Sequence, residues 1–66
     1  MKNRIKVERA ENDWTQADLA SKIGVTRQSI NAIENGKFVP STVLALKIAR
    51  LFKKSIEDIF TLEDTD

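Results

Sequence analysis

Cysteine and histidine are both absent from this chain of 66 residues. A chain this short supports one domain with a marginal core, and small domains commonly compensate with disulfides, a metal or a partner subunit. Disulfides need cysteine, and metal sites usually need cysteine or histidine, so association with a second subunit is the device that remains. We therefore expect one domain over residues 1–66, with no metal site and no cofactor.

Long apolar runs are also missing, since none approaches the roughly 20 residues that a transmembrane helix requires. The segment from Met1 to Arg4 does not lead into the apolar core of a signal peptide. The absence of cysteine is compatible with a reducing compartment. We expect a soluble, cytoplasmic protein.

The chain has few of the residues on which enzymes rely. Without histidine or cysteine, the most frequent general base and the thiol nucleophile are lacking, and no pair of carboxylates stands beside a recognisable pocket. The two glycines, Gly24 and Gly36, each fit the end of a helix, so no glycine-rich phosphate loop is present. We expect no enzymatic activity and no catalytic residues.

Basic and acidic residues are unevenly distributed. Residues 1–54 hold all eleven lysines and arginines against five acids, a net charge of +6, whereas residues 55–66 hold five acids and no base, a net charge of −5. The formal total is only +1. A basic body with an acidic end suits a protein of which one face meets phosphate groups. The alternative is a solvated acidic terminus without a role.

Apolar periodicity and capping residues predict five helices. They are expected from Lys2 or Asn3 to Glu11, over two segments within 16–36, from Thr42 to about Phe52, and in a short segment after Ser55. In the first helix, Val7 and Glu8 reverse the order expected of an amphipathic helix, so one of them must compromise. The fourth helix is apolar nearly all round, which places it in the core or between two buried surfaces. Trp14, the only tryptophan, is expected to pack beneath the first two helices.

The most informative stretch is 16–36, QADLASKIGVTRQSINAIENG, in which Gly24 separates two helices. Each helix has one apolar face, formed in the first by Leu19, Ala20 and Ile23 and in the second by Ile30 and Ile33. Thr15 with Asp18 matches a capping box, and Thr26 can cap the second helix. This spacing is that of a DNA-binding helix-turn-helix. The alternative is an ordinary helical hairpin.

Hydrogen-bonding side chains gather at the N-terminal end of the second of these helices, which is the end that a recognition helix presents to base edges. They are Thr26, Arg27, Gln28, Ser29 and Asn31. Arg27 can offer two parallel donors to guanine O6 and N7, and Gln28 can both donate to and accept from adenine. A surface suited only to solubility would more usually carry lysine and glutamate.

A second surface is predicted near the C-terminus, over about residues 51–63. Its apolar residues are Leu51, Phe52, Ile56, Ile59, Phe60 and Leu62. Because nothing obvious in the monomer covers them, we expect a self-complementary dimer patch, with a short strand formed by Phe60, Thr61 and Leu62 at the interface. The alternative is that these residues close the core of the monomer.

The motifs T-Q-x-x-L-A, G-V-T-R-Q-S-I, I-E-N-G and P-S occur together and in this order. On these motifs the chain resembles the phage-repressor and Cro-like helix-turn-helix regulators, known as the XRE family, over nearly its whole length. The resemblance implies an all-α, compact five-helix bundle that binds a palindromic operator in double-stranded DNA as a homodimer. The recognition helix, residues 27–34, would enter the major groove. It also implies a prokaryotic cytoplasmic protein that lies at the nucleoid when bound.

The resemblance assigns roles to single residues. Gln16 corresponds to a residue that grips a phosphate, and the segment 35–37 corresponds to a loop whose amides and basic side chain meet phosphates. Arg9 and Glu34 correspond to an internal salt bridge. Together with the polar cluster, the expected DNA-contacting residues are Gln16, Thr26, Arg27, Gln28, Ser29, Asn31, Asn35 and Lys37.

Three positions depart from the family pattern. Ala32 is too short to read a base, which narrows the readout and favours recognition of DNA shape. Glu8 replaces an apolar residue, which puts the packing of the first helix in doubt. Lys53 and Lys54 replace a glycine-containing turn, so we expect that turn to be strained or longer. A different class of function also fits the sequence: an antitoxin-like or accessory module whose C-terminal face binds another protein.

Overall fold

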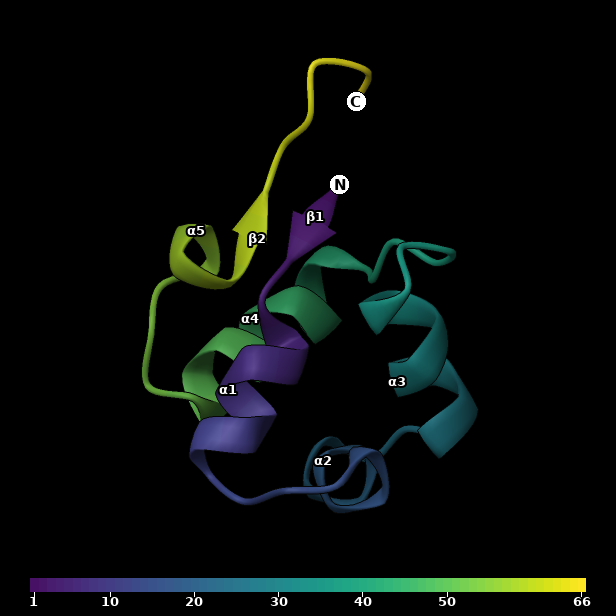
Figure 1. The fold of residues 1–66 in the computed structure, drawn as a ribbon, viewed down its shortest axis with the longest axis vertical. Helices are drawn as coiled ribbons and strands as arrows, with labels where there is room; N and C mark the ends of the chain where they lie inside the picture. The colour runs from purple at the N-terminus through teal and green to yellow at the C-terminus, as the bar shows by residue number, and fades with distance from the viewer.

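The computed structural model describes all of residues 1–66 as five helices and a two-stranded sheet (Figure 1). The elements are β1 (Lys2–Asn3), α1 (Ile5–Glu11), α2 (Gln16–Ile23), α3 (Arg27–Glu34), α4 (Thr42–Leu51), α5 (Ile56–Ile59) and β2 (Phe60–Thr61). The expected compact five-helix domain is confirmed, with a small sheet added. None of the helices has the length and apolar character needed to cross a membrane.

The two ends of the chain are held together by the small sheet. β1 and β2 pair antiparallel, with Lys2 opposite Thr61 and Asn3 opposite Phe60. The expectation that the first helix begins at Lys2 or Asn3 is therefore wrong, and α1 begins at Ile5. The side chain of Asn3 explains the boundary, because its Oδ1 accepts a hydrogen bond from the amide of Ile5 at 3.2 Å.

The predicted C-terminal strand is present at Phe60–Thr61, but its hydrogen-bonding partner is β1 of the same chain. The amide of Arg4 extends this contact by donating to the carbonyl of Ile59 at 2.8 Å. The strand therefore pairs within the monomer through this edge, and its expected place at a dimer interface stays a prediction.

The predicted helix starts are confirmed by their capping hydrogen bonds. Thr15 and Asp18 form a reciprocal capping box at α2, with bonds of 3.0 and 2.9 Å. Ser55 and Asp58 form the same arrangement at α5. Each box satisfies two of the backbone groups that a helix leaves unpaired at its start. Ser41 caps α4 in a simpler way, by accepting from the amide of Leu44.

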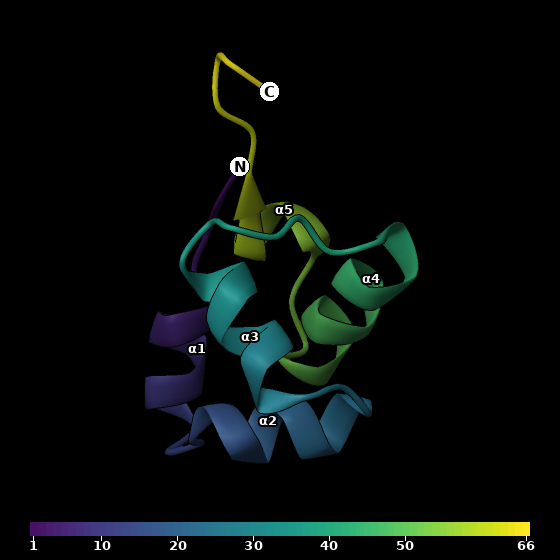
Figure 2. The same ribbon diagram turned by 90° about the vertical axis from the view of Figure 1, so that its right-hand side faces the viewer.

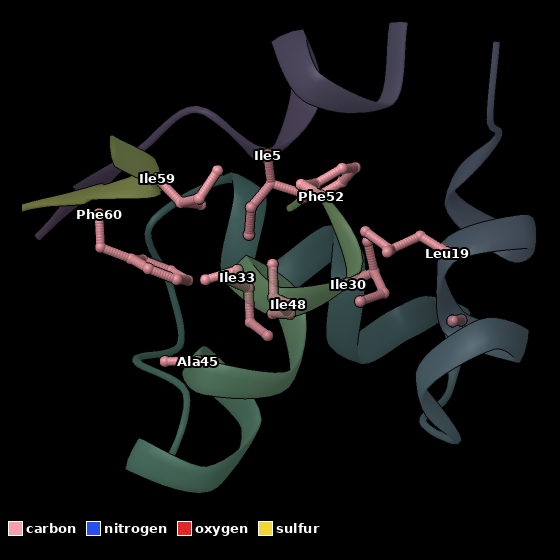
Figure 3. Packing of buried hydrophobic residues seen from close by; sticks show 11 residues of the cluster. Ile5, Leu19, Ile30, Ile33, Ala45, Ile48, Phe52, Ile59 and Phe60 are labelled. Carbon is pink, nitrogen blue, oxygen red and sulfur yellow. The ribbon is translucent and has the colours of Figure 1, made fainter. Parts of the chain in front are cut away.

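The core is one apolar cluster to which every helix contributes (Figure 3). Its members are Ile5, Leu19, Ala20, Ile30, Ile33, Ala45, Ile48, Ala49, Phe52, Ile59 and Phe60. α4 faces this cluster with Ala45, Ile48 and Ala49, whereas Val43 and Leu46 on its other side are 63 % and 53 % exposed. The all-round apolar character of α4 therefore serves the core on one side and leaves an uncovered apolar surface on the other.

Glu8 is the charged residue of the interior, with 2 % of its surface exposed, while Val7 is largely exposed. Its carboxylate accepts a hydrogen bond from the amine of Lys54 at 2.8 Å. This bond raises the pKa of Lys54 above its ordinary value. Two of the three departures from the family pattern thus form one ion pair. The neighbouring Lys53 has a φ of +57°, so the predicted strain in this turn is present.

Trp14 packs against the core, as expected, by stacking on Phe52 at the end of α4 with ring centroids 5.5 Å apart. The amine of Lys22 lies over the indole ring, 4.7 Å from its centroid. Trp14 therefore packs against residues of its own chain and is not part of the polar cluster of α3.

Candidate nucleic-acid interface

The interface is built on the turn between α2 and α3. Gly24 ends α2 with a φ of +75°, a conformation that glycine adopts without steric cost. The amide of Val25 donates to the carbonyl of Ala20 at 3.0 Å, which closes the turn. In Figure 2, α3 lies above α2 and between α1 and α4, with its outer side toward the viewer. The helix-turn-helix predicted from residues 16–36 is thus present.

The N-terminal end of α3 is fixed by Thr26. Its hydroxyl accepts from the amide of Ser29 at 3.1 Å and lies 3.0 Å from the hydroxyl of Ser29. Ser29 is consequently half-buried and engaged with the cap, which makes it a weaker candidate for a base contact than its neighbours.

Arg27 and Gln28 are exposed, and their side chains make no hydrogen bond or ion pair within the protein. With Thr26 and Asn31 they line a shallow hollow that contains no apolar residue. The donors and acceptors needed for base edges are therefore uncommitted on the outer surface of α3.

A chain of side-chain hydrogen bonds links α2 to the exposed face of α3. Gln16 donates to Glu34 at 3.3 Å and accepts from Asn31 at 3.4 Å, and Asn35 donates to Asn31 at 3.1 Å. Three of the residues expected to contact DNA are thus brought together and oriented by one another. Sequence reasoning named all three but did not predict these links, two of which join α2 to α3.

The inner end of this chain is the salt bridge expected between Arg9 and Glu34. Arg9 donates from Nε and Nη2 to the two carboxylate oxygens at 2.6 and 3.0 Å, and from Nη1 to the carbonyl of Trp14 at 2.9 Å. The side chains of Arg9 and Glu34 are only 14 % and 5 % exposed. The hydrogen bonds to Glu34 raise the pKa of the Arg9 guanidinium. The pair is structural, as expected, and joins α1 to α3.

The loop after α3 differs from the expectation in one respect. Gly36 has a φ of +72°, and the amides of Gly36 and Lys37 donate to the carbonyls of Ile33 and Ala32 at 3.1 and 2.9 Å. These amides complete the end of the helix and are not free for phosphates, so the expected role of the loop amides is wrong. The side chain of Lys37 is exposed and remains the phosphate-binding candidate.

At the start of α2, the first backbone amides, beside Gln16, have no acceptor within the helix.

The six residues expected at a dimer interface are divided between core and surface. Phe52, Ile59 and Phe60 belong to the core cluster of the monomer, so the expectation that nothing covers them is wrong. Leu51 and Ile56 are half-buried, and Leu62 is 77 % exposed. The uncovered apolar residues that sequence reasoning did not single out are Phe38, Val39, Val43 and Leu46. For Val43 and Leu46, the apolar residues all round α4 already indicated that this helix has more than one apolar side.

Comparison with known proteins agrees with this geometry. A sequence model of the family described as "Helix-turn-helix" matches residues 5–59. The chain is 56 % identical over 66 residues to an uncharacterized HTH-type transcriptional regulator of Methanocaldococcus jannaschii, and the match covers 100 % of both chains. It is 48 % identical over 64 residues to the uncharacterized HTH-type transcriptional regulator YgzD of Bacillus subtilis, covering 97 % of each.

A similar fold is present in the crystal structure of a candidate DNA-binding protein from Bacteroides fragilis. The TM-score is 0.78 and the sequence identity 31 %, over 88 % of this chain and 94 % of that one. The family match, the relatives and the fold agree with one another. The chain therefore belongs to the XRE (Cro/C1-type) helix-turn-helix family of non-enzymatic, DNA-binding transcriptional regulators.

Proposed function

We propose that this regulator binds an inverted-repeat operator as a homodimer, with α3 of each protomer in the major groove of one half-site. The observation that carries this proposal is the exposed pair Arg27 and Gln28, whose side chains have no partner within the protein. Both stand at the N-terminal end of α3, which a recognition helix presents to bases.

Arg27 and Gln28 supply direct readout. Arg27 pairs with guanine through two donors, Gln28 pairs with adenine through a donor and an acceptor, and each pairing is worth about 1–3 kcal/mol of discrimination. Asn31 and the methyl group of Thr26 add contacts to base edges or sugar. Because Ala32 carries no polar group, sequence-dependent DNA shape contributes at the remaining positions.

Gln16 and Lys37 position the protein on the backbone. Gln16 stands at the N-terminus of α2, where free amides and the positive end of the helix dipole favour a phosphate oxygen. Its side chain is already oriented by Glu34 and Asn31. Lys37 adds an exposed cation at the other end of α3.

Homodimerisation is supported by the apolar surface that the monomer leaves uncovered. Leu46 and Ile56 line one cleft between α4 and α5, and Val43 lies on the same helix as Leu46. A two-fold axis through this surface would cover these residues. A second subunit is also the stabilising device available to a domain of this size.

The decisive experiment is selection of bound duplexes from a random 30-base-pair library at near-physiological salt. The expected result is an inverted repeat with half-site centres about 34 Å apart, one turn of B-DNA. Arg27→Ala should lose discrimination at one or two base pairs, and Gln28→Ala at a neighbouring one. The selection separates sequence-specific binding from phosphate binding alone, because the latter enriches no sequence.

Two outcomes would contradict the proposal. Failure to enrich any sequence would favour the antitoxin-like or accessory module, and equal loss of specific and non-specific affinity in Arg27→Ala would show that Arg27 does not read bases.

The dimer is tested separately. Leu46→Asp should give a folded monomer by sedimentation, since Leu46 is exposed and outside the core cluster. A persistent dimer would place the interface elsewhere.

A further inference from the structure

A pocket between the end of α2 and the outer side of α4 is lined by cations without any acid. We call it the basic pocket, and its lining residues are Lys22, Ile23, Lys47, Arg50, Leu51 and Lys53. The ion pairs of the protein involve only Arg9, Lys54 and the amino group of Met1 as cations. None of the four bases of the pocket forms an ion pair, although the amine of Lys22 also lies over Trp14 and interacts with the charge of Asp18. The mutual repulsion of Lys47, Arg50 and Lys53 would be relieved by an anionic ligand.

The floor of the pocket is apolar, since Ile23 and Leu51 are half-buried between the cations. A bare phosphate would use the charges but not this floor. The lining fits instead a peptide segment that carries an apolar side chain next to several carboxylates.

DNA is a poor candidate for the occupant. Lys22 follows Gln16 by six residues on α2, which places the two side chains about 120° apart around the helix axis. Gln16 belongs to the face that presents α3 to DNA, so the basic pocket is turned to a different side. The other three bases lie on α4 or just after it, outside the helix-turn-helix.

The acidic tail, residues 62–66 with sequence Leu-Glu-Asp-Thr-Asp, has the complementary chemistry. Leu62 is 77 % exposed, and the three acids of the tail, Glu63, Asp64 and Asp66, lie in a segment, residues 55–66, that contains no base. Glu63 and Asp66 contact the amino group of Met1 at 3.3 and 3.1 Å, but exposed ion pairs of this kind are weak. Asp64 has no partner in the chain.

We propose that the basic pocket of one protomer binds the acidic tail of a second copy of this chain. Leu62 packs on Ile23 and Leu51, and the tail carboxylates pair with the surrounding lysines and arginine. The proposal rests on the homodimer proposed above and adds a contact to it. In a two-fold dimer the contact is made twice, once in each direction.

The acidic tail does not lie in the basic pocket of its own chain. The tail leaves β2 at one end of the molecule, whereas α2 lies at the opposite end (Figures 1 and 2). The pairing of β2 with β1 fixes the point where the tail begins, so only five residues, which span at most about 17 Å when fully extended, are available to reach back.

The test is an exchange of charge between pocket and tail. The pocket-reversed variant carries Lys47→Glu and Arg50→Glu, and the tail-reversed variant carries Glu63→Lys and Asp64→Lys. Each alone should weaken the homodimer roughly tenfold or more in sedimentation, because like charges then face each other twice. An equimolar mixture should form mainly the heterodimer by native mass spectrometry, since both of its contacts are again attractive. Combining all four substitutions in one chain should restore the homodimer.

Controls separate this proposal from the others. Lys6→Glu changes an exposed base of α1 outside the pocket and should leave the dimer unchanged, and circular dichroism establishes that each variant is folded. A wild-type dimer whose variants are unaffected, or a statistical mixture of dimers, would overturn the tail contact but leave the proposed function standing. Loss of DNA affinity without loss of dimerisation would identify the pocket as a phosphate site and also overturn it. A wild-type monomer would instead refute the proposed homodimer itself.

Discussion

Removing either member of the Arg9–Glu34 pair should destabilise the domain severely. Both side chains are largely buried, and Arg9 makes three hydrogen bonds there. Breaking a buried pair leaves an unpaired charge in the interior and typically costs about 3–5 kcal/mol. Because Arg9 retains some solvent access, we expect a loss at the lower end, about 3 kcal/mol, for Arg9→Met and for Glu34→Leu.

That loss is a large fraction of the total stability. A domain of 66 residues has a free energy of unfolding of roughly 3–10 kcal/mol. A loss of about 3 kcal/mol lowers the melting temperature by about 12–24 °C. The double variant, Arg9→Met with Glu34→Leu, replaces the charges by apolar groups and should recover most of the loss, with a coupling energy of about 2 kcal/mol or more.

Urea denaturation followed by the fluorescence of Trp14 measures these quantities, because Trp14 is the only tryptophan and stacks on Phe52. The protomer concentration must be the same throughout, since the stability of a dimer depends on it. Lys6→Met, at an exposed site on α1, is the matched control and should stay within about 0.5 kcal/mol of the wild type. If each single variant lost less than about 1 kcal/mol of unfolding free energy, and the double variant lost the sum of the two, the pair would behave as a solvent-screened surface pair. That result would refute this reasoning.

Three further changes test other parts of the structure. Lys37→Ala should weaken binding to all DNA sequences and lower the salt slope of the affinity by about one unit, and an unchanged slope would exclude its phosphate contact. Lys53→Gly should raise the free energy of unfolding by about 0.5–1 kcal/mol, because glycine relieves the left-handed strain at the cost of some entropy; a loss in urea denaturation would contradict this. The hydrogen bonds from Thr15 lower the pKa of Asp18, so its charged form stabilises the fold above the ordinary pKa of about 3.9 and this contribution is lost as the pH falls through the lowered value. The difference in melting temperature between wild type and Asp18→Asn should therefore shrink on acidification, and a constant difference would count against it.

Local features of the fold were predictable because their causes lie within a few residues. A capping box depends on two side chains three positions apart, and both boxes are present as predicted. The turn at Gly24 likewise needs only a residue that adopts positive φ. The Arg9–Glu34 bridge joins positions 25 residues apart and came from the family resemblance, not from periodicity.

Features that depend on contacts between distant residues were not predictable in this way. β1 exists because Lys2 and Asn3 pair with the end of the chain, and two residues carry no strand signal of their own. Lys54, the partner of Glu8, lies 46 positions away, so no neighbouring residue indicates how this buried charge is neutralised. For the same reason, the apolar residues of the C-terminal segment could not be divided between monomer core and surface, and the four cations of the basic pocket form no pattern in the sequence.

The link between the buried salt bridge and Gln16 predicts that the proposed DNA contact depends on the same residues as the stability of the fold. Glu34 uses one carboxylate oxygen to accept from both Arg9 and Gln16, so the same atom anchors α1 and orients the side chain that we propose binds phosphate. Gln16 in turn accepts a hydrogen bond from Asn31 on the exposed face of α3 that we propose reads DNA. A change at Glu34 should therefore weaken operator binding even at temperatures where the variant remains folded. Arg9 makes no hydrogen bond to Gln16 or Asn31, so its replacement should weaken operator binding less than a change at Glu34 that causes the same loss of stability.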